Sequence, residues 1–390
     1  MSQRDDGGHG RKILPGLLAI SIDTRDTDER RRSLERVAEV GRGRSANRAD
    51  LREHLRGPAD GEVIDRVSRF VDFAVVDDPV QAAREAMEAD ARVTASPVHQ
   101  LGFHWHQPFS ATTPERVEDV VFPALPAGDR HRVIAMVDTG VARPESLPPW
   151  MSSSIIHGSG DVEELHDDEV SHGTFVASLL RQVAPSHAVS IAAAGIFDQE
   201  DEHEADHPLP GPTTELHVAG AIDRLIERHQ GLCAVEALNL SIGGSTEADL
   251  VMVTLQQAIA RWRDVFPKTP VFAAAGNTPA TETIYPAGFR YVRGVAAADG
   301  DGKQVVWDQD DSAVEPSTRH WVDDVGPGSD LIGVGGRDPD DAIKWSGSSF
   351  AAAVATASYV NGGPVEVVEG LAYWPSRAMS YGDVPGLQFA

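Results

Sequence analysis

The spacing of hydrophobic positions changes about a third of the way along the chain. From residue 131 onward, short apolar runs alternate with longer stretches that have the apolar spacing of a helix. Buried strands separated by helices are joined by parallel crossover connections. The pattern therefore predicts an α/β fold, a doubly wound and mainly parallel sheet with helices on both faces. The predicted strands are His131–Val137, Ala188–Ala194, Glu236–Leu240, Val271–Ala274 and Tyr291–Ala297, and the predicted helices are Gly173–Gln182, Thr214–Arg228 and Ala248–Arg263.

The first 96 residues have a different order of elements, strand, helix, strand, helix, strand. Such an order is typical of a small α+β domain with helices on one face of its sheet. The predicted strands here are Leu17–Ile22, Phe70–Val76 and Arg92–Ala95, and the predicted helices are Asp28–Val40 and Pro79–Ala89.

Prolines interrupt any regular spacing between these two parts. We interpret residues 97–130 as a linker, so the chain is predicted to consist of an accessory α+β domain at 1–96, the linker, and an α/β domain at 131–390. The prolines that define the linker are Pro97, Pro108, Pro114, Pro123 and Pro126.

Composition narrows the range of partners and locations. The formal net charge of −26 argues against a nucleic-acid-binding surface, which needs clustered Lys and Arg. Cys233 is the only cysteine, so no intrachain disulfide can form. The apolar stretch Ile13–Ile22 is short and is followed by acidic residues, so it predicts neither a signal peptide nor a membrane span. We therefore expect a cytoplasmic protein.

An aspartate and a histidine stand where the predicted elements would hold them rigidly. Asp138 ends the apolar run "RVIAMVD", and the ends of parallel strands form the edge where ligands bind. His172, in "VSHGTFVASLL", comes immediately before a helix. Histidine is a natural base for a hydroxyl because its ordinary pKa, about 6.5, lies near working pH. Taken alone, each residue could equally have a structural role.

A serine and an asparagine complete the set of candidate groups. Ser349 lies in "SGSSFAAAVA", at the start of an alanine-rich helix whose N-terminal amides can stabilise negative charge. Asn277 follows the buried run "VFAAAG" and could donate a hydrogen bond to an oxyanion. Alternatively, Ser349 could be a helix cap and Asn277 a turn residue. The order Asp138, His172, Ser349 is one of the known orders of a convergent catalytic triad.

These motifs resemble those of the subtilisin family of serine proteases, over roughly residues 131–365. The matching segments are "VDTGV", "SHGTFVASLL", "LNLSIGG", "AAAGN", "YPAG" and "SGSSFAAAVA". The resemblance implies that Asp138, His172 and Ser349 form the triad and that Asn277 is the oxyanion donor, together with the Ser349 amide. Residues 70–97 also resemble the second half of the inhibitor-like propeptide found in many such proteases, with an unrelated accessory domain as the alternative.

The resemblance also implies two walls of a substrate-binding cleft. The first would pair with the substrate backbone, and the second would line the pocket for the residue before the scissile bond. Small side chains on the second wall favour a pocket open to a medium or large apolar residue. The wall residues are Ser241, Ile242 and Gly243 for the first, and Ala274, Ala275 and Gly276 for the second.

Two positions depart from the family pattern. Ala353 stands where the serine helix usually has a proline, and Phe175 stands where a second histidine is common. Neither position supplies a proton or an oxyanion donor, so we expect activity to survive both changes.

The sequence thus predicts a serine endopeptidase that acts on peptides or proteins through an acyl-enzyme, regulated by its N-terminal domain. The alternative is a catalytically silent subtilisin-like module that binds a peptide or protein. No cofactor is expected, although the resemblance implies calcium binding in many members. The acidic run Asp198–Asp206 lacks the ligand spacing of a calcium loop, and the pair His104 and His106 has no third ligand nearby. We assign no metal site and leave the oligomeric state open.

Overall fold

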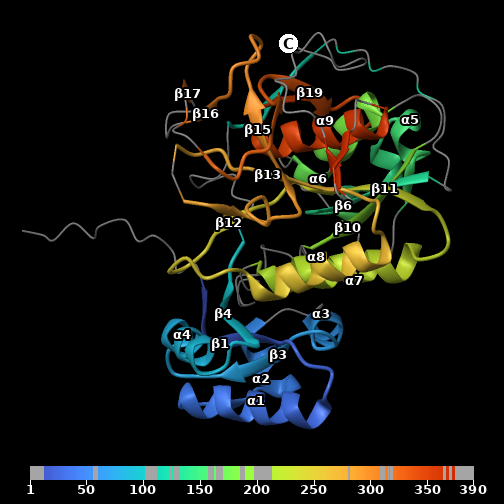
Figure 1. Cartoon of the computed structure of the whole chain (residues 1–390). Coiled ribbons are helices and arrows are strands. Elements are labelled where there is room, and N and C mark those ends of the chain that lie inside the picture. Colours follow the sequence, from blue (N-terminus) through green and yellow to red (C-terminus); the bar gives the residue numbers. More distant parts are fainter. Residues whose placement is uncertain are drawn as a thin grey trace, which may run out of the picture.

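The computed structural model shows two sheets separated by a pair of helices (Figure 1). It describes residues 13–55, 60–101, 112–118, 120, 122, 125, 132–156, 162–163, 170–184, 189–196, 213–279, 282–307, 312–314, 316, 319–362, 366–368 and 371–373. Within them, the larger sheet has seven strands in the order β18-β15-β13-β11-β6-β10-β8, and every neighbouring pair is parallel. The predicted doubly wound α/β fold is confirmed. The strands are β6 Arg132–Asp138, β8 Ile155–Ile156, β10 Ser190–Gly195, β11 Ala234–Leu240, β13 Val271–Ala274, β15 Arg293–Ala298 and β18 Asp324–Pro327.

Alternating side chains of this sheet enter two different hydrophobic cores. On one face, Val133 and Val137 of β6 pack against the helices α7 and α8. On the other face, Ile134 and Met136 of the same strand pack against α6 and α9. Burial of both faces explains why the strands are apolar runs without polar alternation. The helices are α6 His172–Val183, α7 Glu215–His229, α8 Val253–Val265 and α9 Ser348–Val360.

One predicted helix boundary differs from the structure by five residues. The helix predicted from Ala248 begins at Val253 instead. Ala248 and Asp249 have φ angles of 56° and 59°, in the left-handed region, which a right-handed helix cannot include.

The N-terminal sheet is antiparallel, with the strand order β2-β3-β1-β4. Alternate residues of β1 again face opposite sides: Leu18 and Ile20 pack with α1 and α4, while Leu17 and Ala19 face the other way. The helices α2 and α3 are additional to the predicted elements, and β4 extends past the predicted domain boundary at residue 96. The elements are β1 Ile13–Ile22, α1 Thr27–Val40, β2 Arg44–Ser45, α2 Arg48–Leu55, α3 Asp60–Val67, β3 Asp72–Val75, α4 Pro79–Ala89 and β4 Val93–His99.

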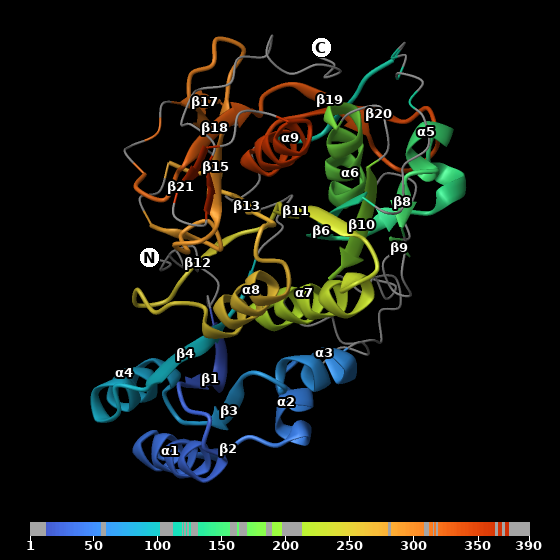
Figure 2. The same cartoon turned by 45° about the vertical axis from the view of Figure 1, so that its right-hand side comes forward.

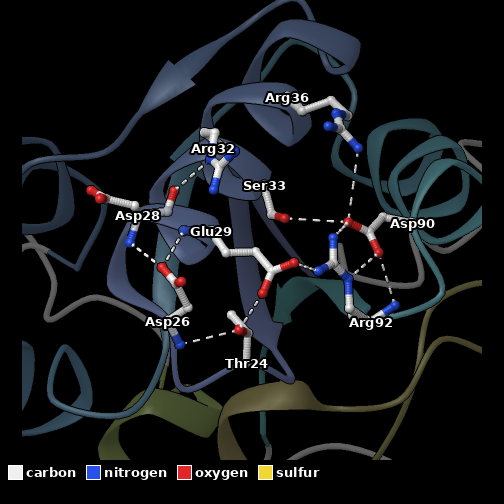
Figure 3. Close-up of polar contacts among 9 residues, drawn as sticks. All are labelled: Thr24, Asp26, Asp28, Glu29, Arg32, Ser33, Arg36, Asp90 and Arg92. Carbon is white, nitrogen blue, oxygen red and sulfur yellow. Dashed lines mark hydrogen bonds and ion pairs between the residues drawn. The ribbon is translucent and has the colours of Figure 1, made fainter.

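Polar contacts join the start of α1 to the junction between α4 and β4 (Figure 3). Asp26 caps α1 by accepting hydrogen bonds from the backbone N–H groups of Asp28 at 2.9 Å and Glu29 at 3.0 Å. The Glu29 carboxylate pairs with Arg92, whose guanidinium also contacts Asp90 at 2.8 Å. This cap and ion-pair network fixes the first turn of α1 against the start of β4.

The N-terminal sheet packs onto α7 and α8, which lie between the two sheets in both views (Figures 1 and 2). One continuous hydrophobic core contains Leu17 and Phe73 of the N-terminal sheet, Ile222 of α7 and Ile259 of α8. The two domains of the chain therefore share buried apolar surface rather than being joined only by a linker.

The region predicted as a linker contains ordered elements. Strand β5, Glu115–Arg116, pairs antiparallel with β20, Ala342–Trp345, which also pairs with β19, Leu331–Val334. Within this region, residues 97–99 belong to β4 and residues 115–116 pair with a strand of the larger domain. The remaining elements are β7 Val141–Ala142, the 3-10 turn Pro144–Ser146, α5 Pro149–Ser152, β9 Val162–Glu163, β12 Gly244–Ser245, β14 Ile284–Tyr285, β16 Val306–Trp307, β17 Ala313–Val314, β21 Glu366–Val368 and β22 Leu371–Tyr373.

Candidate active site

Asp138 is the last residue of β6, at the carboxyl edge of the sheet and between β10 and β11. Its residue surface is completely buried. The backbone N–H of Thr139 donates to its Oδ1 at 2.8 Å. A carboxylate buried in this way needs charged or hydrogen-bonding partners to offset the loss of hydration.

His172 supplies the second partner of that carboxylate. Its Nδ1 lies 2.7 Å from Oδ1 of Asp138, and its side chain is 17% exposed. Because the carboxylate oxygen can only accept, the hydrogen sits on Nδ1, and Nε2 is the basic nitrogen. This tautomer is the one that can remove a proton from a hydroxyl.

Local sequence holds the histidine at the N-terminus of α6. Ser171 caps the helix by accepting a hydrogen bond from the backbone N–H of Thr174 at 2.9 Å. A β-carbon on Gly173 would lie only 1.9 Å from the carbonyl oxygen of Gly140. Only glycine therefore lets α6 approach the end of β6 closely enough for His172 to reach Asp138.

Ser349 lies in the first turn of α9, half-buried, beside the segment that follows β11. Its hydroxyl donates to the backbone carbonyl of Ser241 at 3.1 Å, and the Ser241 hydroxyl donates to the carbonyl of Ser349 at 2.7 Å. Asn239 donates to the Ser241 hydroxyl at 2.8 Å, which fixes that side chain in turn. Two reciprocal hydrogen bonds thus tie the serine to the predicted substrate strand.

Aromatic packing brings the histidine and the serine helix together. The ring of His172 lies 5.4 Å from that of Phe350, the residue after Ser349, and 5.6 Å from that of Trp345. Phe175 is fully buried and lies 4.6 Å from Phe350 between ring centroids. The phenylalanine that departs from the family pattern therefore belongs to the hydrophobic support beneath the site.

Asn277 is oriented toward the start of the same helix. Its Oδ1 accepts a hydrogen bond from the backbone N–H of Ser348 at 2.7 Å. The N–H of Gly276 donates to the Ser348 hydroxyl at 3.1 Å. Because Oδ1 is used as an acceptor, the orientation of the carboxamide is set and its Nδ2 is the donor end.

Sequence reasoning missed Arg319, which supports this asparagine loop from behind. Its buried guanidinium donates to the carbonyl of Gly276 at 2.8 Å and also contacts the carbonyl of Thr278. Trp321 donates to the carbonyl of Ala275 at 3.0 Å. Burial lowers the pKa of Arg319 to about 10. No periodic or motif signal marks this arginine, because its partners are backbone atoms more than 40 residues earlier.

The two predicted substrate walls are neighbours in the structure. The first wall follows β11 and the second begins with the last residue of β13, and these strands pair with Leu240 opposite Ala273. Not all wall residues have side chains available to a substrate, since Ile242 is 2% exposed and Ala275 is completely buried. Ser241, Gly243, Ala274 and Gly276 complete the walls, and their role in substrate binding stays a prediction.

The two segments that were considered for metal binding and not assigned lie outside the described residues. The acidic run at 198–206 and the histidines at 104 and 106 both lie there. Within the part of the chain that the structure describes, no group of three or more His, Cys, Asp or Glu could hold a metal ion. None of the described helices is long and apolar enough to cross a bilayer.

A parallel sheet with an Asp–His pair at its carboxyl edge and a serine at the start of a helix is the arrangement expected of a subtilisin-like serine protease. The sequence model of the subtilase family matches residues 129–360. The chain belongs to this family of serine proteases, which act on peptides or proteins.

Comparison with known proteins gives these further findings. Among curated proteins, no sequence matches. Among solved structures, the chain is similar to the prenylagaramide maturation protease PagA, with 20% identity over 59% of this chain and 74% of that one and a TM-score of 0.43. It is also similar to a lanthipeptide protease, with 18% identity, coverage of 59% and 72% and a TM-score of 0.44. For the patellamide maturation protease PatA, identity is 22%, coverage 60% and 78%, and the TM-score 0.42.

Proposed function

We propose that this subtilase is an active endopeptidase in which Ser349 is the nucleophile, His172 the general base and acid, and Asp138 the residue that orients the histidine. The 2.7 Å contact between His172 Nδ1 and Asp138 Oδ1 carries the proposal. It selects the tautomer in which Nε2 is basic and stabilises the imidazolium that forms during the reaction.

The serine must turn before it can react. Its hydroxyl hydrogen is now directed to the carbonyl of Ser241. Rotation about the Cα–Cβ bond would direct it toward the imidazole of His172, whose ring already packs against the next residue, Phe350. Substrate binding along residues 241–243 would favour this rotation, because catalytic hydrogen bonds commonly tighten only in the substrate complex.

The proposed reaction then follows two matched steps. His172 takes the Ser349 proton while Oγ attacks the scissile carbonyl, and Asn277 with the Ser349 amide stabilises the oxyanion. The protonated His172 gives its proton to the leaving amine, which breaks the C–N bond and leaves an acyl-enzyme. Water then attacks the ester carbonyl while His172 takes its proton, and His172 gives that proton to Ser349 Oγ as the C–O bond breaks, which releases the acid and restores the serine.

A fluorophosphonate probe tests the nucleophile directly. Wild-type protein should be labelled at Ser349, and Ser349→Ala should not. Ser358→Ala removes another serine hydroxyl from the same helix and should be labelled like wild type. If wild type is not labelled, the chain is a silent module that binds peptides or proteins without cleaving them.

We further propose that the N-terminal domain controls access to this site. The backbone N–H of Leu101 donates to the carbonyl of Thr213 at 2.9 Å. A β-carbon on Gly244 would lie 3.0 Å from Cδ2 of Leu101. Leu101, two residues after the end of β4, therefore lies beside Gly244, which is three residues after Ser241. At this position the segment after β4 can compete with a substrate.

N-terminal sequencing of the purified protein tests this control. A wild type that cleaves itself should give a second N-terminus within residues 97–130, while Ser349→Ala should begin only at residue 1 or 2. If wild type shows only its original N-terminus, the chain does not cut itself in this region.

A further inference from the structure

The position of the substrate residue before the scissile bond follows from the proposed function. Its carbonyl carbon must bond to Ser349 Oγ, and its oxygen must point to Asn277. By the family resemblance, the side chain on that residue lies between the walls 241–243 and 274–276. The side chain between the walls determines which substrate residues can precede the cleaved bond. The inference therefore rests on the proposed function.

Ile284 lies between these two walls. It lies on β14, which pairs with β12 so that Ile284 is opposite Ser245 and Tyr285 is opposite Gly244. A β-carbon on Gly243 would lie 2.6 Å from its Cγ2, and a β-carbon on Gly276 would lie 2.8 Å from its Cγ1. One isoleucine side chain therefore touches both walls at once.

The two glycines thus make room for this isoleucine. Neither wall can gain a β-carbon without displacing Ile284, and Ile284 is only 5% exposed. Its backbone is held by the ladder to β12 and by the N–H of Gly288, which donates to its carbonyl at 2.7 Å. A β-branched side chain on a strand has few rotamers into which it could withdraw.

We propose that Ile284 determines specificity by closing the deep part of the pocket, so that the enzyme cuts after small residues: glycine, alanine or serine. The small side chains of the walls alone favoured a medium or large apolar residue. The isoleucine between them changes that expectation, because inserting a large side chain into filled space strains the packing.

Cleavage of matched peptides by the full-length protein tests this proposal. The substrates differ only at the residue before the scissile bond, which is Ala, Ser, Leu or Phe. Wild type should show a kcat/KM for Ala at least about 50-fold above that for Phe, since each methylene that does not fit costs roughly 10- to 200-fold. Ile284→Gly should raise kcat/KM for Phe by about 10-fold or more and reduce the preference for Ala.

A second buried isoleucine separates this role from general packing. Ile259 lies on α8, in the same hydrophobic core but away from the walls, and is 4% exposed. Ile259→Ala should lower thermal stability without changing the ratio of kcat/KM between Phe and Ala. An unchanged ratio in Ile284→Gly, or a wild type that prefers Leu or Phe, would overturn the proposal.

Labelling with a fluorophosphonate keeps the two proposals distinguishable. A wild type that is labelled at Ser349 and prefers large residues would refute only the role of Ile284. If it is not labelled at all, the proposed peptidase function fails, and the specificity proposal fails with it.

Discussion

At the scale of single residues, the site depends on a short contact between two side chains from distant segments. Motif order predicted Asp138, His172, Asn277 and Ser349 as the site, because each lies at or shortly after the end of a strand or in the first turn of a helix. Ile284 and Arg319 could not be selected in this way. Their roles come from contacts with backbone segments that only the folded chain brings beside them.

Replacing Asp138 by Asn should remove most activity while leaving the fold intact. The amide of asparagine could donate a hydrogen bond to Nδ1 of His172, which would place the ring hydrogen on Nε2. No basic nitrogen would then face Ser349. We expect kcat to fall by roughly 10⁴-fold, with a small effect on KM. Steady-state kinetics measure this, and Asp338→Asn, at an aspartate 49% exposed, should match wild type. If kcat falls by less than about 10-fold, Asp138 does not orient the base.

Arg319→Met should disturb the oxyanion donor without touching the substrate. The carbonyls of Gly276 and Thr278 would lose their donor, and the loop that carries Asn277 would shift. A displacement near 1 Å can lower a rate by about 10²-fold, so we expect a loss of that order in kcat with KM nearly unchanged. Arg319→Lys should restore part of the loss. If kcat falls only in proportion to the loss of thermal stability in each of the two variants, Arg319 supports the fold alone.

At the scale of elements, apolar spacing predicted the buried strands well, and Val271–Ala274 has the bounds of β13. The pattern missed α2 and α3, which have only eight residues each. In α2 the only large apolar residues are Leu51 and Leu55, which are both buried, and a cap at its start adds to the stability of the helix. Asn47 accepts from the N–H of Ala49 at 2.8 Å, and Asp50 accepts from the N–H of Asn47 at 2.7 Å.

This cap predicts an acid-sensitive contribution to stability. The hydrogen bonds from Arg44 and from the Asn47 N–H lower the pKa of Asp50 from 3.8 to about 2. A carboxyl with a lowered pKa stabilises the folded state above its unfolded pKa, and this contribution is lost as pH falls from about 4 to 2.

Thermal unfolding as a function of pH measures that contribution. Asp50→Asn should unfold at a lower temperature than wild type at pH 6, and the difference should shrink as pH approaches 3. Glu53→Gln, an exposed change on the same helix, should follow wild type throughout. A difference that stays constant with pH would show that the charge of Asp50 is not involved.

At the scale of the whole molecule, the docking of the N-terminal domain could not be read from the sequence. A proline-rich segment suggested a loose connection, whereas the structure buries a common core. Glu215 is at the centre of this interface: it accepts from the backbone N–H of His99 at 3.0 Å and from those of Thr254 at 3.0 Å and Leu255 at 3.2 Å. One buried carboxylate thus joins β4, α7 and the start of α8.

Glu215→Gln should loosen this interface. The amide keeps one acceptor oxygen, so at least one buried N–H would lose its partner, at a cost of about 1–3 kcal/mol. Amide hydrogens of β4, Val93–His99, should then exchange faster with solvent, by roughly 10-fold. Glu35→Gln, on α1 at a side chain 62% exposed, is the control. Unchanged exchange in β4 would mean that apolar packing alone holds the domains together.

The helices α7 and α8 are covered by a sheet on each side, and this bears on any activation by cleavage. A cut after Leu101 would separate the chain into two pieces that still bury the same apolar surface against each other. The severed N-terminal piece would stay in place as a tightly held subunit. Release of the enzyme would then depend on how fast that piece unfolds or is digested, so activation would be timed by its stability rather than by the first cut.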